Sequence, residues 1–309
     1  MKKHRNALWV FIPFFAFAFL LPQFSSADDL IVVTSPAALN SARALQQTAM
    51  PQQQTAVQIQ GSLPAPDFKA KSVLIYDPAT DANLYEKNSE QELPIASLTK
   101  LMTAIVASES PNFDKPITLT SADQLNVAPV LHLQAGDTVR PEDLVKSMLV
   151  GSANDAALAL SNHFPDQQTF IEIMNQKAKN LGMTHTHFTT PIGFDTPGNY
   201  STAGDLKILV NYALNRLPYP QIWQTKDYYF VSMSGREYYV QNSNDLVYNH
   251  ANILSIKTGY TDLAQGNMIV LAKDDAGRQI ISVVLNSGQR ENDTMTAVDY
   301  IFKTFSWGN

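Results

Sequence analysis

Cysteine is absent from all 309 residues of the sequence. Its absence excludes disulfide bonds, thiolate nucleophiles, iron–sulfur clusters and zinc sites with cysteine ligands. Covalent chemistry would therefore need an oxygen or nitrogen nucleophile. Basic residues are also few, since 22 Lys and Arg stand against 28 Asp and Glu. Because nucleic-acid binding needs clustered cations to neutralise phosphates, the net charge of −6 argues against a nucleic-acid partner.

The sequence also lacks an apolar run long enough to cross a bilayer, which takes about 20 residues. Three basic residues at the start precede a run of 15 residues from Ala7 to Leu21, and small residues follow up to Ala27. This order is typical of a secretory signal peptide. We predict that residues 1–27 are a signal peptide cleaved after Ala27, with a retained anchor as the alternative. Export without cysteine favours a bacterial periplasm or cell envelope.

Residues 28–67 have few charges and no sustained apolar face, but they contain seven Gln and four Pro. We predict a disordered Gln/Ala/Pro-rich linker in this segment. If the N-terminal segment is retained, the linker becomes a membrane tether, and only then do we expect membrane contact. Order is predicted to begin at Phe68, so that 68–309 forms one domain.

Strands are predicted near both ends of this domain and helices between them. β-Branched and alternating apolar residues predict strands at 72–76, 83–85, 228–232, 237–241, 268–272 and 279–285. Helical spacing predicts helices at 97–106, 141–150, 155–163, 170–181 and 203–214, and a last helix from about Asp293 that includes Phe305. We predict an α+β fold in which strands from both chain ends form one antiparallel sheet flanked by helices, with a mostly helical insert.

Ser97 and Lys100 stand at spacing i, i+3, so a helix would bring their side chains together. A serine hydroxyl becomes a strong nucleophile when a neighbouring base removes its proton. Lysine can be that base only if burial or a second cation lowers its pKa. Taken alone, the pair is weak evidence, and it favours Ser97 as a helix N-cap with Lys100 as a solvated residue.

Two further short motifs carry polar groups. Ser152 and Asn154 lie at a predicted helix connection, where they could face a cleft or cap a helix. Lys257, Thr258 and Gly259 follow an apolar strand, whose free backbone groups could bind an extended peptide. Lys257 could supply the second cation, and Gly259 permits close approach of a ligand or another backbone. A strand end in solvent is the alternative.

In this order, the three motifs together resemble the catalytic signature of serine penicillin-binding proteins and β-lactamases. The segments 94–103, 151–156 and 257–262 are similar to the low-molecular-mass penicillin-binding proteins that are D-alanyl-D-alanine carboxypeptidases, serine peptidase family S11. The resemblance covers about 70 to 305. It implies a β-lactamase-like fold, with 68–309 as a serine D,D-peptidase catalytic domain.

The resemblance implies acyl transfer on a peptidoglycan stem peptide. Ser97 would attack the carbonyl between two D-alanines while neutral Lys100 takes its proton. The backbone N–H groups of Ser97 and Tyr260 would form the oxyanion hole, and Ser152 would pass a proton to the leaving amine.

The remaining motif residues would bind and orient the substrate. Asn154 and Lys257 would orient Lys100 and the peptide, Thr258 would contact the terminal carboxylate, and Gly259 completes the substrate-binding strand. The resemblance implies no cofactor and no metal, and it implies β-lactams as covalent inhibitors of Ser97.

Two departures from the family pattern are visible. Gln265 stands where the family usually places Gly after Ala264, which puts the turn beside the site in question. The sequence also ends about fifty residues after Lys257, without the β-rich second domain and amphipathic helix of many members. A D-alanyl-D-alanine endopeptidase that cleaves crosslinks is therefore the main alternative.

Other functions are less expected. Between Asn154 and Lys257 there is no Glu-x-x-x-Asn motif of the kind a class A β-lactamase would use for deacylation. A non-catalytic wall-binding protein would have lost the reactive residues, all of which are present.

Two clusters remain outside these motifs. His185 and His187 alternate as metal ligands on a strand would, but with no third ligand we interpret them as a surface strand. An aromatic cluster could bind sugar rings, but we interpret it as the cross-strand packing of a hairpin. Its members are Tyr228, Tyr229, Phe230, Tyr238 and Tyr239.

Overall fold

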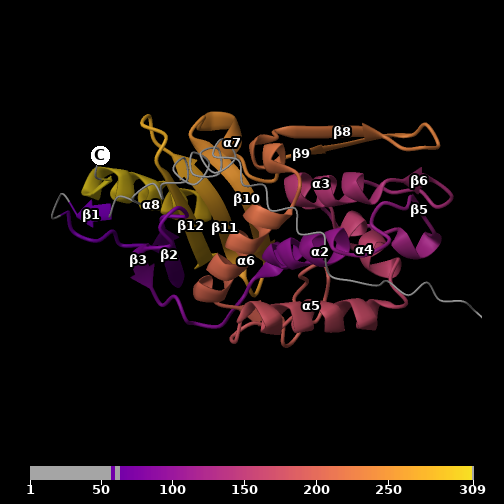
Figure 1. The fold of residues 1–309 in the computed structure, drawn as a ribbon, viewed down its shortest axis with the longest axis horizontal. Coiled ribbons are helices and arrows are strands. Elements are labelled where there is room, and N and C mark those ends of the chain that lie inside the picture. Colours follow the sequence, from indigo (N-terminus) through magenta and orange to yellow (C-terminus); the bar gives the residue numbers. More distant parts are fainter. Residues whose placement is uncertain (1–56, 60–62, 308–309) are drawn as a thin grey trace, which may run out of the picture. The chain divides into compact units, whose positions relative to one another are not determined.

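The computed structural model describes residues 57–59 and 63–307. Its central element is a five-stranded antiparallel sheet with the strand order β10-β11-β12-β2-β3 (Figure 1). The strands are β2 (Ser72–Tyr76), β3 (Asn83–Lys87), β10 (Ile253–Thr261), β11 (Gln265–Lys273) and β12 (Gln279–Ser287). Strands from both ends of the domain thus meet in one sheet, which confirms the predicted α+β fold.

The helices lie mainly between β3 and β10 in sequence. They are α2 (Thr99–Ser108), α3 (Pro141–Gly151), α4 (Asn154–Asn162), α5 (Gln167–Leu181), α6 (Ala203–Arg216), α7 (Leu246–Asn249) and, after the sheet, α8 (Arg290–Thr304). Short 3-10 turns are η1 (Ala96–Leu98), η2 (Ser121–Asp123) and η3 (Pro220–Gln224). No helix in the described ranges has both the length and the apolarity needed to cross a membrane.

Four two-stranded ribbons complete the fold. They pair β1 (Val57–Ile59) with β13 (Phe305–Trp307), β4 (Leu93–Pro94) with β7 (Tyr200–Ser201), β5 (Ile117–Thr118) with β6 (Thr138–Val139), and β8 (Asp227–Val231) with β9 (Glu237–Gln241). The β8–β9 hairpin runs along α3 (Figure 1).

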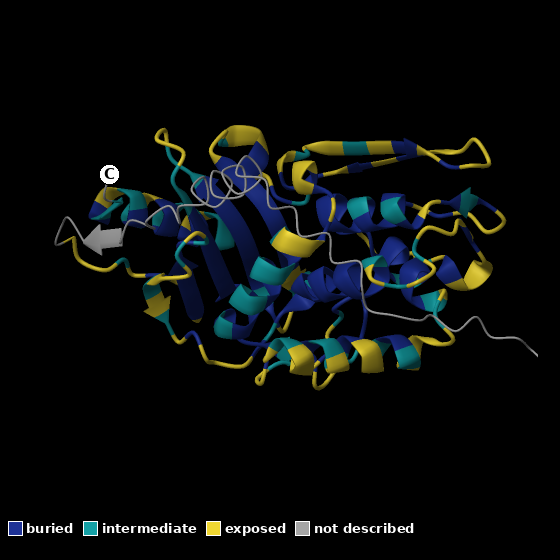
Figure 2. Cartoon of the chain, viewed as in Figure 1, coloured by how far each residue is buried: buried dark blue, intermediate teal, exposed yellow. Residues whose placement is uncertain are grey.

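Alternating side chains of β2 give the sheet two buried faces. Leu74 and Tyr76 point into the larger core beneath the helical insert, whereas Val73 and Ile75 point into a second core under α8. Each fully buried apolar side chain contributes about 1.5–3 kcal/mol relative to exposure. Within the insert, α2 is buried along almost its whole length (Figure 2). Lys100 therefore belongs to a buried helix, and Ser97 lies in the 3-10 turn that leads into it.

The predicted bounds of the last helix are wrong at both ends. It begins at Arg290 rather than near Asp293, and it ends at Thr304, so Phe305 lies in β13 instead. The reason is tertiary: Phe305 pairs with Ile59, and strand pairing satisfies backbone groups that local spacing does not reveal. The same pairing places a short strand inside the segment 28–67, for which we predicted only a linker. The predicted signal peptide and residues 28–56 of that linker lie outside the described residues.

The turn between β10 and β11 carries Gln265, the departure noted in the sequence, where glycine was expected. Gln265 adopts a φ of +52°, in the left-handed region that usually favours glycine. Its side-chain amide donates to the Asp262 carbonyl at 2.6 Å. The Asn286 amide donates to the carbonyls of Leu263 and Ala264 at 3.2 and 2.9 Å. These hydrogen bonds hold the turn and offset the strain at Gln265.

Asp293 joins the first turn of α8 to the entry of the sheet. This buried carboxylate accepts hydrogen bonds from the backbone N–H of Ala70 at 2.8 Å and of Lys69 at 3.1 Å. It also accepts the Ser287 hydroxyl at 2.6 Å. One side chain therefore connects α8 to the nearby end of β12 and to residues 69–70, more than 220 positions away.

We predict that Asp293→Ala lowers the free energy of unfolding by about 2–4 kcal/mol, because it leaves buried donors unpaired. Chemical denaturation measures the loss. The matched control is Asp299→Ala, on the same helix, whose carboxylate pairs with Lys303 in solvent and contributes well under about 1 kcal/mol. Equal losses for the two variants would contradict this role of Asp293.

We predict that Gln265→Val destabilises the protein by about 1–2 kcal/mol, because a β-branched side chain is strained at positive φ. Gln265→Gly removes the strain together with one exposed hydrogen bond, so its stability should stay within about 1 kcal/mol of the parent. Thermal unfolding of both variants tests this order. A Val variant as stable as the Gly variant would show that the turn relaxes.

Candidate active site

Ser97 lies in η1, the 3-10 turn that leads into α2, and Lys100 lies in the first turn of α2. The Nζ of Lys100 is 2.7 Å from the Oγ of Ser97. Neither alternative for the pair holds: Lys100 is fully buried, and Ser97 is not an N-cap, since no side-chain capping bond is present at the start of α2. The turn thus presents a hydroxyl directly to an amine.

Burial, and then the charge of the nearby Lys257, hold the pKa of Lys100 well below its ordinary value. Burial, and then the charge of Arg290, lower the pKa of Lys257 to about 7. Like charges and a low-dielectric environment both disfavour the ammonium form. The lowered pKa favours the neutral amine of Lys100, whose lone pair can accept the Ser97 proton.

The backbone of residues 191–193 holds Lys100 in this position. The Ile192 carbonyl accepts a hydrogen bond from Lys100 Nζ at 2.8 Å. Gly193 follows, with a φ of +91°, and a Cβ there would lie 2.0 Å from the Ala96 carbonyl oxygen. Only glycine fits, because the loop passes directly against the turn that carries Ser97. Sequence reasoning missed this loop, since a backbone carbonyl leaves no signature in residue type.

Gly259 brings β10 against the same turn. A Cβ at Gly259 would lie 3.0 Å from both the Ile95 carbonyl oxygen and the Ser97 backbone nitrogen. The close approach expected at Gly259 is thus to backbone. Lys257 is fully buried in mid-strand rather than at a strand end in solvent, because β10 continues to Thr261.

β10 is an outer strand of the five-stranded sheet, with β11 as its neighbour. Its other edge can therefore accept an extended peptide as an added strand. Tyr260, which follows Gly259, keeps 62% of its side chain exposed beside this edge.

Two hydroxyls meet at Thr258, and a guanidinium contacts the backbone of the next residue. The Oγ1 of Thr258 is 2.6 Å from the Oγ of Ser243, and Arg290 Nη1 donates to the Gly259 carbonyl at 2.9 Å. The same guanidinium also pairs with Glu291 through Nε at 2.7 Å. Hydroxyls and a guanidinium are groups that can bind a carboxylate. Sequence reasoning did not identify Ser243 or Arg290. Arg290 is 31 positions from Gly259 in the sequence, and only the folded chain brings the two residues into contact.

Ser152 and Asn154 connect α3 to α4. Ser152 is buried and takes a φ of +60° where α3 ends. Asn154 Nδ2 donates to the Val127 carbonyl at 2.8 Å, which fixes the loop above it. The Ser243 N–H donates to the Val150 carbonyl at 2.9 Å, so the end of α3 adjoins the hydroxyl pair at Thr258. In the described structure the Ser152 hydroxyl makes no hydrogen bond to Ser97 or Lys100.

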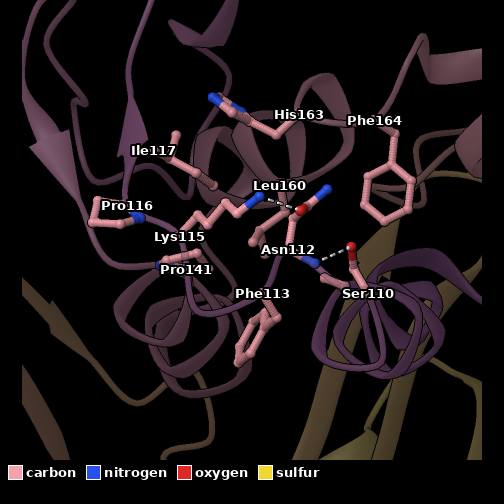
Figure 3. A pocket seen from close by; sticks show the side chains of 11 residues that line it. Ser110, Asn112, Phe113, Lys115, Pro116, Ile117, Pro141, Leu160, His163 and Phe164 are labelled. Atoms are coloured by element: carbon pink, nitrogen blue, oxygen red, sulfur yellow. Dashed lines mark hydrogen bonds between the residues drawn. The ribbon is translucent and has the colours of Figure 1, made fainter. Parts of the chain in front are cut away.

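A partly enclosed cavity of about 290 Å³ lies at the other end of α2, away from these residues (Figure 3). Its walls include Phe113, Ile117, Leu160 and Phe164, and no motif residue lines it. In the part of the chain that the structure describes, no group of His, Asp or Glu is arranged to hold a metal. His187 instead places Nδ1 2.8 Å from the Gly198 carbonyl.

Comparison with known proteins places this geometry in a family. A family model described as D-alanyl-D-alanine carboxypeptidase matches residues 53–289. The carboxypeptidase DacC of Escherichia coli is 33% identical over 247 residues, which cover 75% of this chain and 60% of DacC. A D-alanyl-D-alanine endopeptidase of Pseudomonas aeruginosa is 32% identical over 211 residues, which cover 66% of this chain and 67% of the endopeptidase.

A solved structure agrees with these matches. The D-alanyl-D-alanine carboxypeptidase of Mycobacterium tuberculosis superposes with a TM-score of 0.72 at 28% identity, covering 82% of this chain and all of the other. Sequence and fold lead to the same assignment: this chain belongs to the peptidase S11 family of D-alanyl-D-alanine carboxypeptidases.

Proposed function

We propose that this protein is a serine D-alanyl-D-alanine carboxypeptidase that removes the terminal D-Ala from peptidoglycan stem peptides. The observation that carries the proposal is the 2.7 Å contact between Ser97 Oγ and Lys100 Nζ at a site where two lysines are buried. Family membership supports the substrate class.

Acylation follows from this contact. Neutral Lys100 removes the Ser97 proton as Oγ attacks the carbonyl between the two D-alanines. The backbone N–H groups of Ser97 and Tyr260 stabilise the developing oxyanion, a contribution typically worth about 3 kcal/mol per donor. Ser152 passes a proton to the leaving D-alanine amine. Water then hydrolyses the ester on Ser97 and restores the enzyme.

Recognition uses the open edge of β10. The stem peptide adds to this edge as a strand, so its terminal carboxylate reaches Thr258, with Ser243 and Arg290 beside it. Lys257 supplies a further positive charge when protonated, and Asn154 orients the peptide. β-Lactams, which mimic the acyl-D-Ala-D-Ala group, acylate Ser97 by the same steps.

An endopeptidase that cleaves D,D-crosslinks is the second candidate. It is supported by similarity, because the chain is 32% identical to the Pseudomonas endopeptidase and 33% identical to DacC. Both activities use the same chemistry and differ in whether a second peptide follows the scissile bond. Faster cleavage of a crosslinked dimer than of a free pentapeptide would assign the endopeptidase.

We further propose that the protein is exported to the periplasm or cell envelope of a bacterium. The support is the signal-like segment 1–27 together with a wall substrate. Membrane contact is proposed only if that segment is retained.

Incubation with penicillin should add the mass of one antibiotic molecule to the protein, and Ser97→Ala should abolish the adduct. The same variant should reduce hydrolysis of a pentapeptide ending in D-Ala-D-Ala by about 10³-fold or more. Intact-mass spectrometry and D-alanine release measure the two effects. A folded Ser97→Ala protein that still forms the adduct would remove Ser97 from the mechanism.

The pH dependence of acylation should respond to Arg290. Acylation needs Lys100 neutral and Lys257 protonated, so kcat/KM rises with pH through the pKa of Lys100 and falls through that of Lys257, about 7. Arg290→Gln removes a positive charge, which raises the pKa of Lys257. The descending limb should therefore move to higher pH.

The control for this experiment is Arg278→Gln, because Arg278 pairs with Asp274 at the far end of β11 and β12. Its penicillin acylation profile should match the parent. If the descending limb of the Arg290→Gln profile stays at the same pH as in the parent, the protonation of Lys257 does not determine that limb.

A further inference from the structure

The β8–β9 hairpin carries aromatic side chains on both of its faces, and packing explains only one of them. On the inner face, Phe230 stacks on Tyr228 and Tyr238 with ring centroids 5.9 and 5.1 Å apart. On the outer face, Tyr229 and Tyr239 stand directly opposite each other in the strand register. These two side chains are 51% and 53% exposed. The predicted cross-strand packing therefore leaves two of the five aromatic residues unexplained.

Carboxylates on the opposite strand hold the two outer rings. The Tyr239 hydroxyl donates to Asp227 Oδ1 at 2.6 Å, diagonally across the hairpin. Tyr229 has a raised pKa, caused by partial desolvation and then by a hydrogen bond to Glu237, the reverse diagonal. Each hydroxyl therefore interacts with a carboxylate of the neighbouring strand, while about half of each tyrosine stays exposed to solvent.

The charges around this surface are mainly negative. Asp227 and Glu237 lie on the outer face itself. The nearby cations face other groups, since Arg236 Nε lies 3.6 Å from the buried Asp137 and Lys226 Nζ lies over the Tyr248 ring. An anionic polymer or lipid surface is disfavoured here. Flat aromatic faces flanked by hydrogen-bond acceptors suit a neutral chain of pyranose rings with hydroxyl and amide donors.

We propose that Tyr229 and Tyr239 form a platform that binds the glycan strand of peptidoglycan by stacking on its N-acetylated sugar rings. Asp227 and Glu237 accept hydrogen bonds from sugar hydroxyl or acetamido groups at its margins. The inference rests on the proposed function, since the glycan is the polymer to which a stem peptide is attached.

The path from the platform to the active site fits the length of the substrate. Tyr239 precedes Ser243 by four positions (243 − 239), and Ser243 contacts Thr258. At a rise of about 3.3 Å per residue, four residues span at most roughly 13 Å. An extended stem pentapeptide spans roughly 17 Å. The stretch of chain from Ser243 to Tyr239 is therefore shorter than an extended stem pentapeptide.

The test compares two substrates that share one scissile bond: a free pentapeptide and the same pentapeptide attached to a short glycan. The variant is Tyr229→Ala with Tyr239→Ala. The matched control is Val231→Ala, whose side chain is 44% exposed on the same face but has no ring. We expect the double variant to raise KM for the glycan-linked substrate by about five-fold, equivalent to about 1 kcal/mol, with kcat unchanged.

Other readouts separate failure of this inference from failure of the proposed function. KM for the free pentapeptide and the rate of penicillin acylation should not change in the double variant. Chitohexaose, a soluble chain of N-acetylglucosamine, should shift the NMR signals of the hairpin in the parent and in Val231→Ala but not in the double variant. This titration needs no catalysis. An unchanged KM for the glycan-linked substrate, or chitohexaose binding that survives in the double variant, overturns the platform.

Discussion

The active site depends on the burial of two lysines close to each other. Each ammonium group raises the cost of charging the other, and the surrounding protein removes the water that would stabilise both. The pKa of Lys100 is consequently lowered, which the proposed role of Lys100 as a base requires in serine chemistry without histidine. The Ile192 carbonyl and the close approach of β10 keep these amines buried and in position.

The surrounding fold compensates for that burial with hydrogen bonds and packing. Lys100 donates to the Ile192 carbonyl and Lys257 to the Thr258 carbonyl, so neither amine is buried without a partner. The close approach of β10 and of the 191–193 loop to the Ser97 turn requires glycine at positions 259 and 193. Burying two amines lowers the free energy of unfolding. The two apolar cores on either face of the sheet offset this loss.

Much of this could be predicted from sequence because the relevant signals are local. The strand at 72–76 and the hairpin partner at 237–241 have the predicted bounds, since alternation and turn residues specify them. Ser97 and Lys100 meet because helical spacing places them together. The features that were missed are contacts between distant positions. The Ile192 carbonyl lies 92 positions from Lys100 in the sequence. Phe305, which was predicted in the last helix, instead lies in a strand and pairs with Ile59. Residue type alone does not report such partners.

The central sheet pairs strands from both ends of the domain, and this pairing affects when the active site can form during folding. β2 pairs with β12, so the sheet closes only after nearly the whole chain is available, and such long-range closure is slow. A chain interrupted before β10 contains Ser97 and Lys100 but lacks Lys257 and the strand that packs on the Ser97 turn. Without them Lys100 is hydrated and carries its proton at neutral pH. We therefore expect Ser97 to be unreactive in a nascent or truncated chain and to become reactive only in the folded, full-length domain.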